Sequence, residues 1–272
     1  MKLCQRMVNF CGMLSMAGQG LLCAYMILGY SPYCQLVLWW NPNFIKLSEV
    51  NNSGVRVSVC KSAESRQHGM IVSVATSLWL PLPSETVFNF FKDEKNRVQW
   101  DVLSNGNPVH EIANISTRTH PGDCICVIRV PMFLLYKQFS LISMVSVEHP
   151  FINTENNMSM LQESYTDPLG SLFVYAQVDI PALNVAVSGE DSSNIPILLS
   201  GFVISGDGRA EITGDSGNSR VGGSLLTVAF QILVSSPSIS KQMNMESVAT
   251  VNTLISSTVQ KIQVALNCSS FD

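Results

Sequence analysis

Apolar residues alternate with polar ones, or gather in short β-branched runs, along most of the chain after residue 54. Val55–Lys61 alternates strictly, which is typical of a half-buried strand. Met70–Leu80 is rich in β-branched residues and stops at two prolines, so it is predicted as a second strand. The same signals predict strands over Val109–Ile115, Asp123–Arg129, Ser159–Thr166, Ser171–Ile180, Pro196–Ser205 and Gly223–Ser235. Asp167–Gly170 is typical of a hairpin turn, and Gly206–Gly222 is typical of a long exposed loop.

After the second predicted strand, apolar residues recur at helical spacing. The sequence predicts one amphipathic helix over Ser84–Trp100, with Ser84 as its N-cap. Phe88 lies off the apolar stripe and is expected to cover an edge. The charged residues of this helix are expected on its solvated face: Asp93, Glu94, Lys95 and Arg97.

The most regular helical pattern closes the sequence. Met245–Asn267, capped by Asn244, is predicted as a helix of roughly 34 Å at 1.5 Å per residue. Its apolar stripe consists of Val248, Val251, Ile255, Val259, Ile262 and Leu266. A sheet with one apolar face must be covered, and only this helix is long enough to cover a curved antiparallel sheet of about seven strands.

Two apolar stretches follow neither period. The first has no charged residue from Met7 to Ile45, and its best window for a membrane span, Leu21–Trp40, is interrupted by glycine, serine and proline. The second, Pro131–Val147, is too short to span a membrane as a helix. Membrane binding is therefore not expected, while a membrane-anchored or soluble lipid carrier stays an alternative.

Composition and charge exclude several classes of protein. Of the 272 residues, 46% are hydrophobic and 13% are charged, with a formal net charge of −4. The apolar content excludes a wholly disordered chain, and the acidic balance argues against a nucleic-acid surface, which needs clustered lysine and arginine. Eight cysteines are too few for a disulfide scaffold. Only Cys124 and Cys126 are close partners, and no second pair supplies further zinc ligands, so neither metal nor cofactor is expected.

One short segment has the residue order of a catalytic motif. Gly214–Gly217 has the Gly-Asp-Ser-Gly order found around the nucleophile of trypsin-like proteases. That chemistry needs a histidine base and a buried carboxylate that converge on the serine. The four histidines lie in no matching context, so catalysis is not expected.

Several segments resemble one family. Ala75–Pro81 (ATSLWLP), Gln99–Gly106 (QWDVLSNG), Val174–Ala182 (VYAQVDIPA) and Gly222–Leu233 (GGSLLTVAFQIL) are similar to the C-terminal region of plant class IV homeodomain–leucine zipper transcription factors. Phe88–Glu94 and Glu246–Asn252 carry the same likeness. The resemblance covers Asn51–Ser269, apart from the second apolar stretch.

The order of the elements resembles the START-like helix-grip architecture, an α+β fold in which an antiparallel sheet curves around a long C-terminal helix. Such an arrangement leaves space between sheet and helix, where apolar ligands bind. The candidate lining residues are Trp79, Trp100, Tyr175, Phe230, Val251 and Ile255. Plain core packing is the alternative for the aromatic ones.

The resemblance implies a non-enzymatic regulatory module that binds a lipid or another apolar ligand, or that only supports the upstream parts. In the family, those parts are a homeodomain, a leucine zipper that makes the protein dimeric, and a START domain, which act in the nucleus on epidermal cell identity. This chain carries none of them and is not expected to bind DNA by itself. A helix-grip enzyme acting on an apolar substrate is the alternative from another class.

The resemblance also divides the chain. Residues 1–19 look like the end of the preceding START domain's last helix, 20–50 are an apolar insertion and linker, and 51–272 are the START-like domain, interrupted by an apolar insertion at 130–149. We expect both insertions to be translated introns, because uridine-rich codons encode phenylalanine, leucine, isoleucine, methionine and valine.

Overall fold

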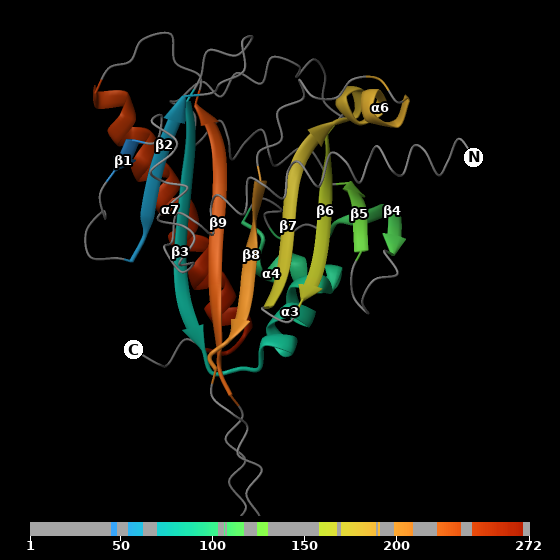
Figure 1. Cartoon of the computed structure of the whole chain (residues 1–272), viewed down its shortest axis with the longest axis vertical. Coiled ribbons are helices and arrows are strands. Elements are labelled where there is room, and N and C mark those ends of the chain that lie inside the picture. Colours follow the sequence, from blue (N-terminus) through green and yellow to red (C-terminus); the bar gives the residue numbers. More distant parts are fainter. Residues whose placement is uncertain are drawn as a thin grey trace, which may run out of the picture.

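A nine-stranded antiparallel sheet is the central layer of the fold, seen in Figure 1. The coordinates are those of a computed structural model. They describe residues 45–47, 54–61, 70–102, 106, 108–116, 124–129, 158–167, 170–188, 190, 199–208, 222–234 and 241–268. The strand order is β1-β2-β3-β9-β8-β7-β6-β5-β4. The early strand β3 therefore pairs directly with β9, the last strand in the sequence.

The strands match the predicted ones closely, with one addition. They are β1 Ile45–Leu47, β2 Arg56–Lys61, β3 Met70–Leu80, β4 His110–Ser116, β5 Cys124–Arg129, β6 Met158–Asp167, β7 Gly170–Asp179, β8 Leu199–Gly206 and β9 Ser224–Val234. The predicted hairpin is confirmed, because Asp167 pairs with Gly170. β1 was not predicted, and it lies within the region assigned to the linker.

Side chains on alternate positions divide the sheet into an inner and an outer face. The inner face carries Val72 and Val74 of β3, and Phe173 and Tyr175 of β7, all at most 3% exposed. These residues belong to one large core cluster together with the helices. The outer face carries a smaller cluster around Leu161 of β6.

The first helical region is broken where the sequence predicted one helix. α3 spans Ser84–Lys92, the 3-10 helix η1 spans Glu94–Asn96, and α4 spans Arg97–Trp100. The backbone of Asp93, which follows α3, is extended, and its side chain accepts a hydrogen bond from the Lys95 backbone N–H. Asp93 is therefore the N-cap of η1.

Two further details of that prediction were wrong. Ser84 is the first helical residue rather than the N-cap, which is Pro83. Phe88 is 6% exposed and packs in the main core instead of covering an edge. Val87, Phe88 and Phe91 together form the buried side of α3.

The terminal helix α7 spans Lys241–Ala265, so Asn244 is not its cap. Lys241, Gln242 and Met243 are good helix formers, which extends the helix upstream of the predicted start. At its other end, Asn267 has a φ of 55°, and the Cys268 N–H donates to the Gln263 carbonyl while the Asn267 N–H donates to that of Val264. This is a Schellman motif with asparagine in the left-handed position.

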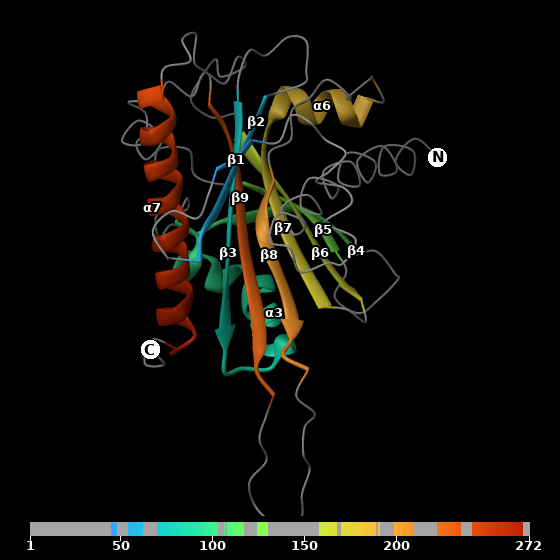
Figure 2. The same cartoon turned by 60° about the vertical axis from the view of Figure 1, so that its left-hand side comes forward.

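The long helix grips the inner face of the sheet as predicted. Figure 2 shows α7 running along one side of the sheet, where it packs on β3, β9 and α4. Val251, Ile255 and Ile262 of the predicted stripe are fully buried, while Val259 is half-buried. The START-like helix-grip fold class is therefore confirmed.

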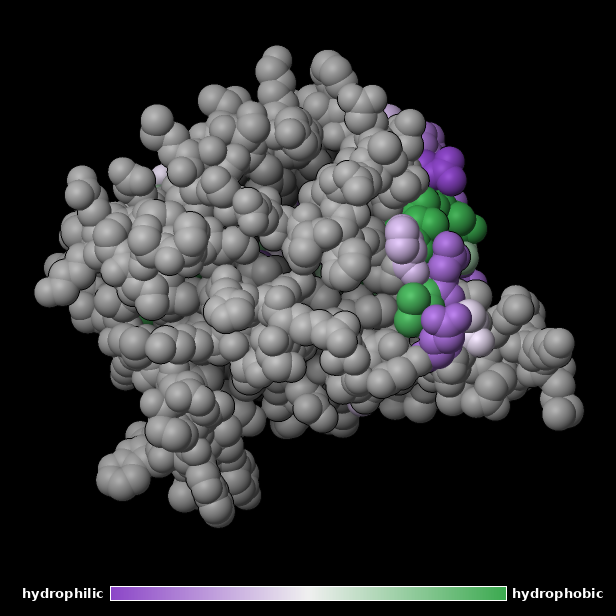
Figure 3. Space-filling model, turned by 90° about the horizontal axis from the view of Figure 1, so that it is seen from above, coloured by the Kyte–Doolittle hydropathy of each residue, from purple (hydrophilic) through white to green (hydrophobic). Residues whose placement is uncertain are grey.

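A further helix covers part of the outer face. α6 spans Ile180–Ser188, and its Leu183 packs on Ile125, Val127, Leu161 and Val178. In the view from above in Figure 3, the coloured residues form a band at the right, in which hydrophobic and hydrophilic side chains are interleaved. Among the residues that the structure describes, no helix combines the length and apolar character that a membrane span requires.

Candidate functional site

A charged side chain lies in the middle of the apolar interior. Arg97 of α4 is 1% exposed, and its Nε donates to the Asp101 carboxylate across 2.9 Å. Nη1 donates to the side-chain oxygen Oε1 of Gln162 on β6, and Nη2 faces the sulfur of Met160. Asp101 is also 1% exposed, so this is a buried ion pair, which survives burial only because both charges are paired and hydrogen-bonded.

Aromatic rings surround this ion pair. The guanidinium carbon of Arg97 lies 5.0 Å from the Trp100 ring centre and 4.9 Å from that of Tyr175, which are cation–π distances. Phe91 stacks on Phe202 at 4.1 Å, and Trp100 meets Phe202 edge to face at 5.1 Å. The space between α3, α4 and the middle of the sheet is thus filled by rings.

The structure brings five of the six predicted lining residues together. Trp100, Tyr175, Phe230, Val251 and Ile255 are at most 3% exposed and belong to the same core cluster. Whether they also line a ligand site stays a prediction.

Trp79 lies apart from these residues. It is 47% exposed on the outer face of β3, opposite in direction to Leu78 and Leu80, and its indole N–H donates to Asp207. The same carboxylate accepts the Gly223 N–H at 3.0 Å, which closes the base of the loop between β8 and β9. Alternation along Met70–Leu80 was the available signal, because Ser73 and Ser77 lie on the same face of the strand as Trp79.

Several buried polar atoms on the inner side have no hydrogen-bond partner within the described part of the chain. They include Trp100 Nε1 of α4, Gln177 Nε2 of β7 and Asn252 Oδ1 of α7. Gln177 follows Tyr175 on the same face of β7, and α4 packs against α7. Buried donors and acceptors are usually paired, so these three atoms are exceptions among the described residues.

Burial also changes the acidity of groups around the interior. It raises the pKa of the Tyr175 hydroxyl, and Asp101 adds to this effect, so the phenol stays protonated. Burial and the neighbouring Glu111 carboxylate raise the pKa of Glu94 at the break between α3 and α4. The interior therefore holds Arg97 and Asp101 as a paired charge beside a neutral phenol.

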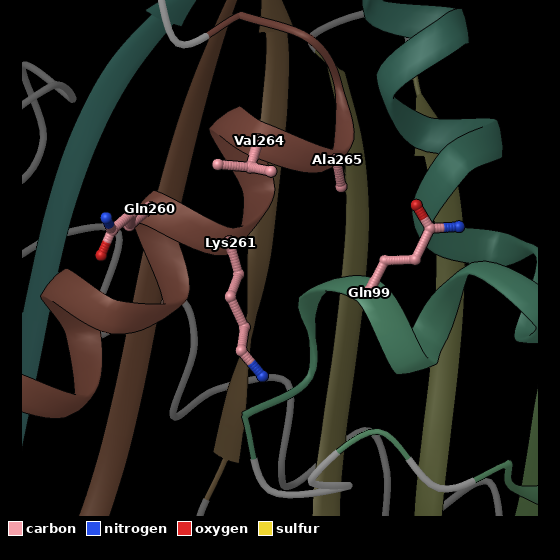
Figure 4. Close-up of a pocket in the computed structure, with 5 residues that line it drawn as sticks. All are labelled: Gln99, Gln260, Lys261, Val264 and Ala265. Atoms are coloured by element: carbon pink, nitrogen blue, oxygen red, sulfur yellow. The ribbon is translucent and has the colours of Figure 1, made fainter.

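A shallow depression of about 360 Å³ lies on the outside, between α4 and the end of α7. Figure 4 shows that Gln99 comes from α4, while Gln260, Lys261, Val264 and Ala265 come from α7. Its lining is open and partly polar, in contrast to the buried aromatic interior behind it.

Arg97 is the residue that sequence reasoning placed wrongly. A continuous helix sets it among charged neighbours on the solvated face, but the break at Asp93 restarts the helix and turns Arg97 inward. The signal that was available is the spacing of Arg97 and Asp101, which are four residues apart, as in a helical ion pair.

Within the described residues, no group of three or more histidine, cysteine, aspartate or glutamate side chains lies together so that it could hold a metal ion. Gly214–Gly217 and three of the four histidines lie outside the described residues. The remaining one, His110, is exposed on β4.

The fold and interior define a START-like helix-grip domain, and comparisons with known proteins identify its family. The family described as PDF2-like, C-terminal domain matches residues 31–142 and 132–268. Homeobox-leucine zipper protein HDG11 of Arabidopsis thaliana is 47% identical over 227 residues, covering 81% of this chain and 28% of that protein. Homeobox-leucine zipper protein ROC8 of Oryza sativa subsp. japonica is 42% identical over 287 residues, covering 99% of this chain and 34% of that protein.

The chain belongs to the PDF2-like C-terminal domain family of plant class IV homeodomain–leucine zipper proteins. It spans about a third of the length of these relatives. Human StAR-related lipid transfer protein 5 is a structural match with a TM-score of 0.39 and 13% identity, covering 93% of this chain and 97% of that chain. A likeness this distant says nothing about what the interior of this chain binds. The division of the chain at residues 19, 50 and 130–149 stays a prediction.

Proposed function

We propose that this chain is a non-enzymatic regulatory domain of a class IV homeodomain–leucine zipper transcription factor, acting in the nucleus, and that it binds an apolar ligand between the sheet and α7. Its relatives are homeobox-leucine zipper proteins, which supports the regulatory role. DNA binding and zipper dimerisation belong to other parts of such proteins in this proposal, and the present chain supplies the ligand-responsive part.

The unpartnered polar atoms of the inner face support ligand binding most directly. Trp100 Nε1 and Gln177 Nε2 are donors, Asn252 Oδ1 is an acceptor, and all three atoms are buried without a hydrogen-bond partner among the described residues. A molecule with an apolar body and one polar end satisfies such an interior, because buried polar groups cost free energy unless they are hydrogen-bonded.

Binding of such a ligand regulates the domain through its stability. A ligand that binds only the folded state stabilises it by about 2.7 kcal/mol at a free concentration one hundred times the dissociation constant. α7 supplies Val251 and Ile255 to the core cluster and carries the buried Oδ1 atom of Asn252, so its packing on the sheet is the part of the fold most directly affected.

Native mass spectrometry of the full chain, purified without detergent, tests the proposal. We expect a bound molecule that organic extraction removes, and a fluorescent fatty acid that then binds in its place. Gln177→Leu removes one buried donor and should weaken the binding of this fatty acid about tenfold. Gln99→Leu, at an exposed position on α4, is the matched control and should leave the binding unchanged.

Two results would contradict ligand binding. The first is a chain that is bare as purified and takes up no fatty acid. The second is equal loss of affinity in the Gln177→Leu and Gln99→Leu variants, because the inner face would then not be the binding surface.

A further inference from the structure

Two cysteines lie side by side on the inner face of β5, close to the edge of the sheet. The sulfur atoms of Cys124 and Cys126 are 3.6 Å apart, and the Ser164 hydroxyl of β6 lies 3.1 Å from Cys124. β5 is the neighbour of β4, the strand at this edge of the sheet. We propose that Cys124 and Cys126 form a redox-responsive dithiol, which a hydroperoxide oxidises to a disulfide within β5.

The environment gives the two thiols different roles. Cys124 is half-buried, whereas Cys126 is 3% exposed within the main core. Hydrogen bonds with Cys126 and Ser164, helped by the charge of Lys92, lower the pKa of Cys124 to about 6 against the opposing effects of burial and Glu111. The hydrogen bond to Cys124, burial and Glu111 raise the pKa of Cys126.

A thiolate beside a protonated thiol is the arrangement found in redox-sensing pairs. Cys124 is the more exposed of the two and can be reached by an oxidant, so we assign it as the attacking thiolate and the buried Cys126 as the resolving thiol. This assignment is independent of the proposed ligand, because it depends only on β5, Ser164 and the neighbouring charges.

The reaction balances with a hydroperoxide as the oxidant. The Cys124 thiolate attacks one oxygen of hydrogen peroxide, the O–O bond breaks, and cysteine sulfenic acid and hydroxide form. The Cys126 sulfur then attacks the sulfenic sulfur and forms the S–S bond. The sulfenic oxygen leaves as hydroxide, which takes the Cys126 proton to give water, so the two cysteines lose two electrons in total.

Oxidation would change the position of both strands that pair with β5, namely β4 and β6. Closing the pair brings the sulfur atoms from 3.6 Å to about 2.05 Å, which bends the strand between them. Cys124 pairs with Ser116 of the edge strand β4, and Cys126 pairs with Gln162, the residue that holds Arg97. A change of redox state is thereby transmitted to the edge of the sheet and to the buried ion pair.

Trypsin isolates this site within the full chain. Cleavage after Arg118 and Arg129 releases the peptide THPGDCICVIR, which contains only these two of the eight cysteines. After mild peroxide treatment and alkylation of the remaining free thiols, we expect this peptide to be unalkylated and lighter by about 2 Da, the mass of two hydrogens. Reduction with dithiothreitol should restore both thiols.

Cys268 provides the matched control, because it is buried, no other thiol neighbours it among the described residues, and burial raises its pKa. At pH 7, alkylation of Cys124 should be about tenfold faster than that of Cys268, and the difference should shrink below pH 6 as Cys124 takes up its proton. A Cys126→Ser variant should stop at the sulfenic acid on Cys124, which a dimedone probe captures.

Three results would overturn the proposal. One is recovery of the peptide with both thiols free after peroxide has oxidised other cysteines of the chain. Another is reaction of Cys124 no faster than Cys268. The last is dimedone labelling of the Cys126→Ser variant at the same low level as the unmodified chain, since no sulfenic acid would then have formed.

Discussion

Arg97 shows how a single charged residue can be held inside an apolar core. Its guanidinium group donates to Asp101 and Gln162 and lies between the rings of Trp100 and Tyr175. Each of these contacts replaces part of the hydration that burial removes. Arginine suits this role because its planar guanidinium group can stack on aromatic rings while its N–H groups donate hydrogen bonds.

Removing this cation should destabilise the protein strongly. Arg97→Met keeps a long apolar side chain but leaves Asp101 buried without its ion-pair partner, so we expect the free energy of unfolding to fall by about 3–5 kcal/mol. Urea denaturation followed by tryptophan fluorescence measures this loss. Lys95→Met, at an exposed position in the preceding turn, should change stability by about 0.5 kcal/mol or less. Equal losses in the two variants would show that the buried pair contributes nothing.

At this scale, the sequence predicted apolar positions better than polar ones. Trp100, Phe230 and Ile255 are buried where their spacing placed them. Arg97 was missed because its direction depends on a helix break set by the side chain of Asp93. Trp79 was expected inside as a large aromatic residue, although Ser73 and Ser77 share its face of the strand.

At the scale of elements, the strands were predictable and the short helices were not. Period-two patterns and turn residues located most strands to within a few residues. α6 was missed because Ile180–Ser188 is apolar nearly all round and has no helical period, although Pro181 in its first turn is compatible with a helix start. Both ends of α7 differ from the predicted ones. The start lies upstream because Lys241, Gln242 and Met243 have high helix propensity, and the end lies before Asn267 because that residue adopts a left-handed turn.

Close approach of neighbouring strands gives a sharp test at this scale. A Cβ atom added at Gly201 of β8 would collide with the Phe173 carbonyl oxygen of β7, whereas one added at Gly206 would meet nothing within 4 Å. Gly201→Ala should therefore lower the free energy of unfolding by about 1–3 kcal/mol.

Gly206→Ala is the matched control on the same strand and should leave the melting temperature almost unchanged. Thermal unfolding of the two variants, followed by circular dichroism, compares them directly. If Gly201→Ala melts together with Gly206→Ala, β7 and β8 are not packed as closely as the structure shows.

At the scale of the whole molecule, the order of elements determined the architecture. Antiparallel strands followed by one long amphipathic helix can bury their apolar faces together only if the helix lies across the sheet. The sequence could not show how full the interior is, because that depends on ring packing between α3, α4 and β7, which come from distant parts of the chain. It also could not show which polar atoms stay without partners.

The central claim is that α7 closes an interior which holds an apolar ligand against the inner face of the sheet. Hydrogen–deuterium exchange of the full chain, with and without the fluorescent fatty acid, tests this claim most directly. We predict that the amides of Val251–Ile262 in α7 exchange among the slowest, and that the fatty acid slows them further while leaving α6 unchanged. Exchange in α7 that is as fast as in α6, or that the fatty acid does not alter, would contradict it.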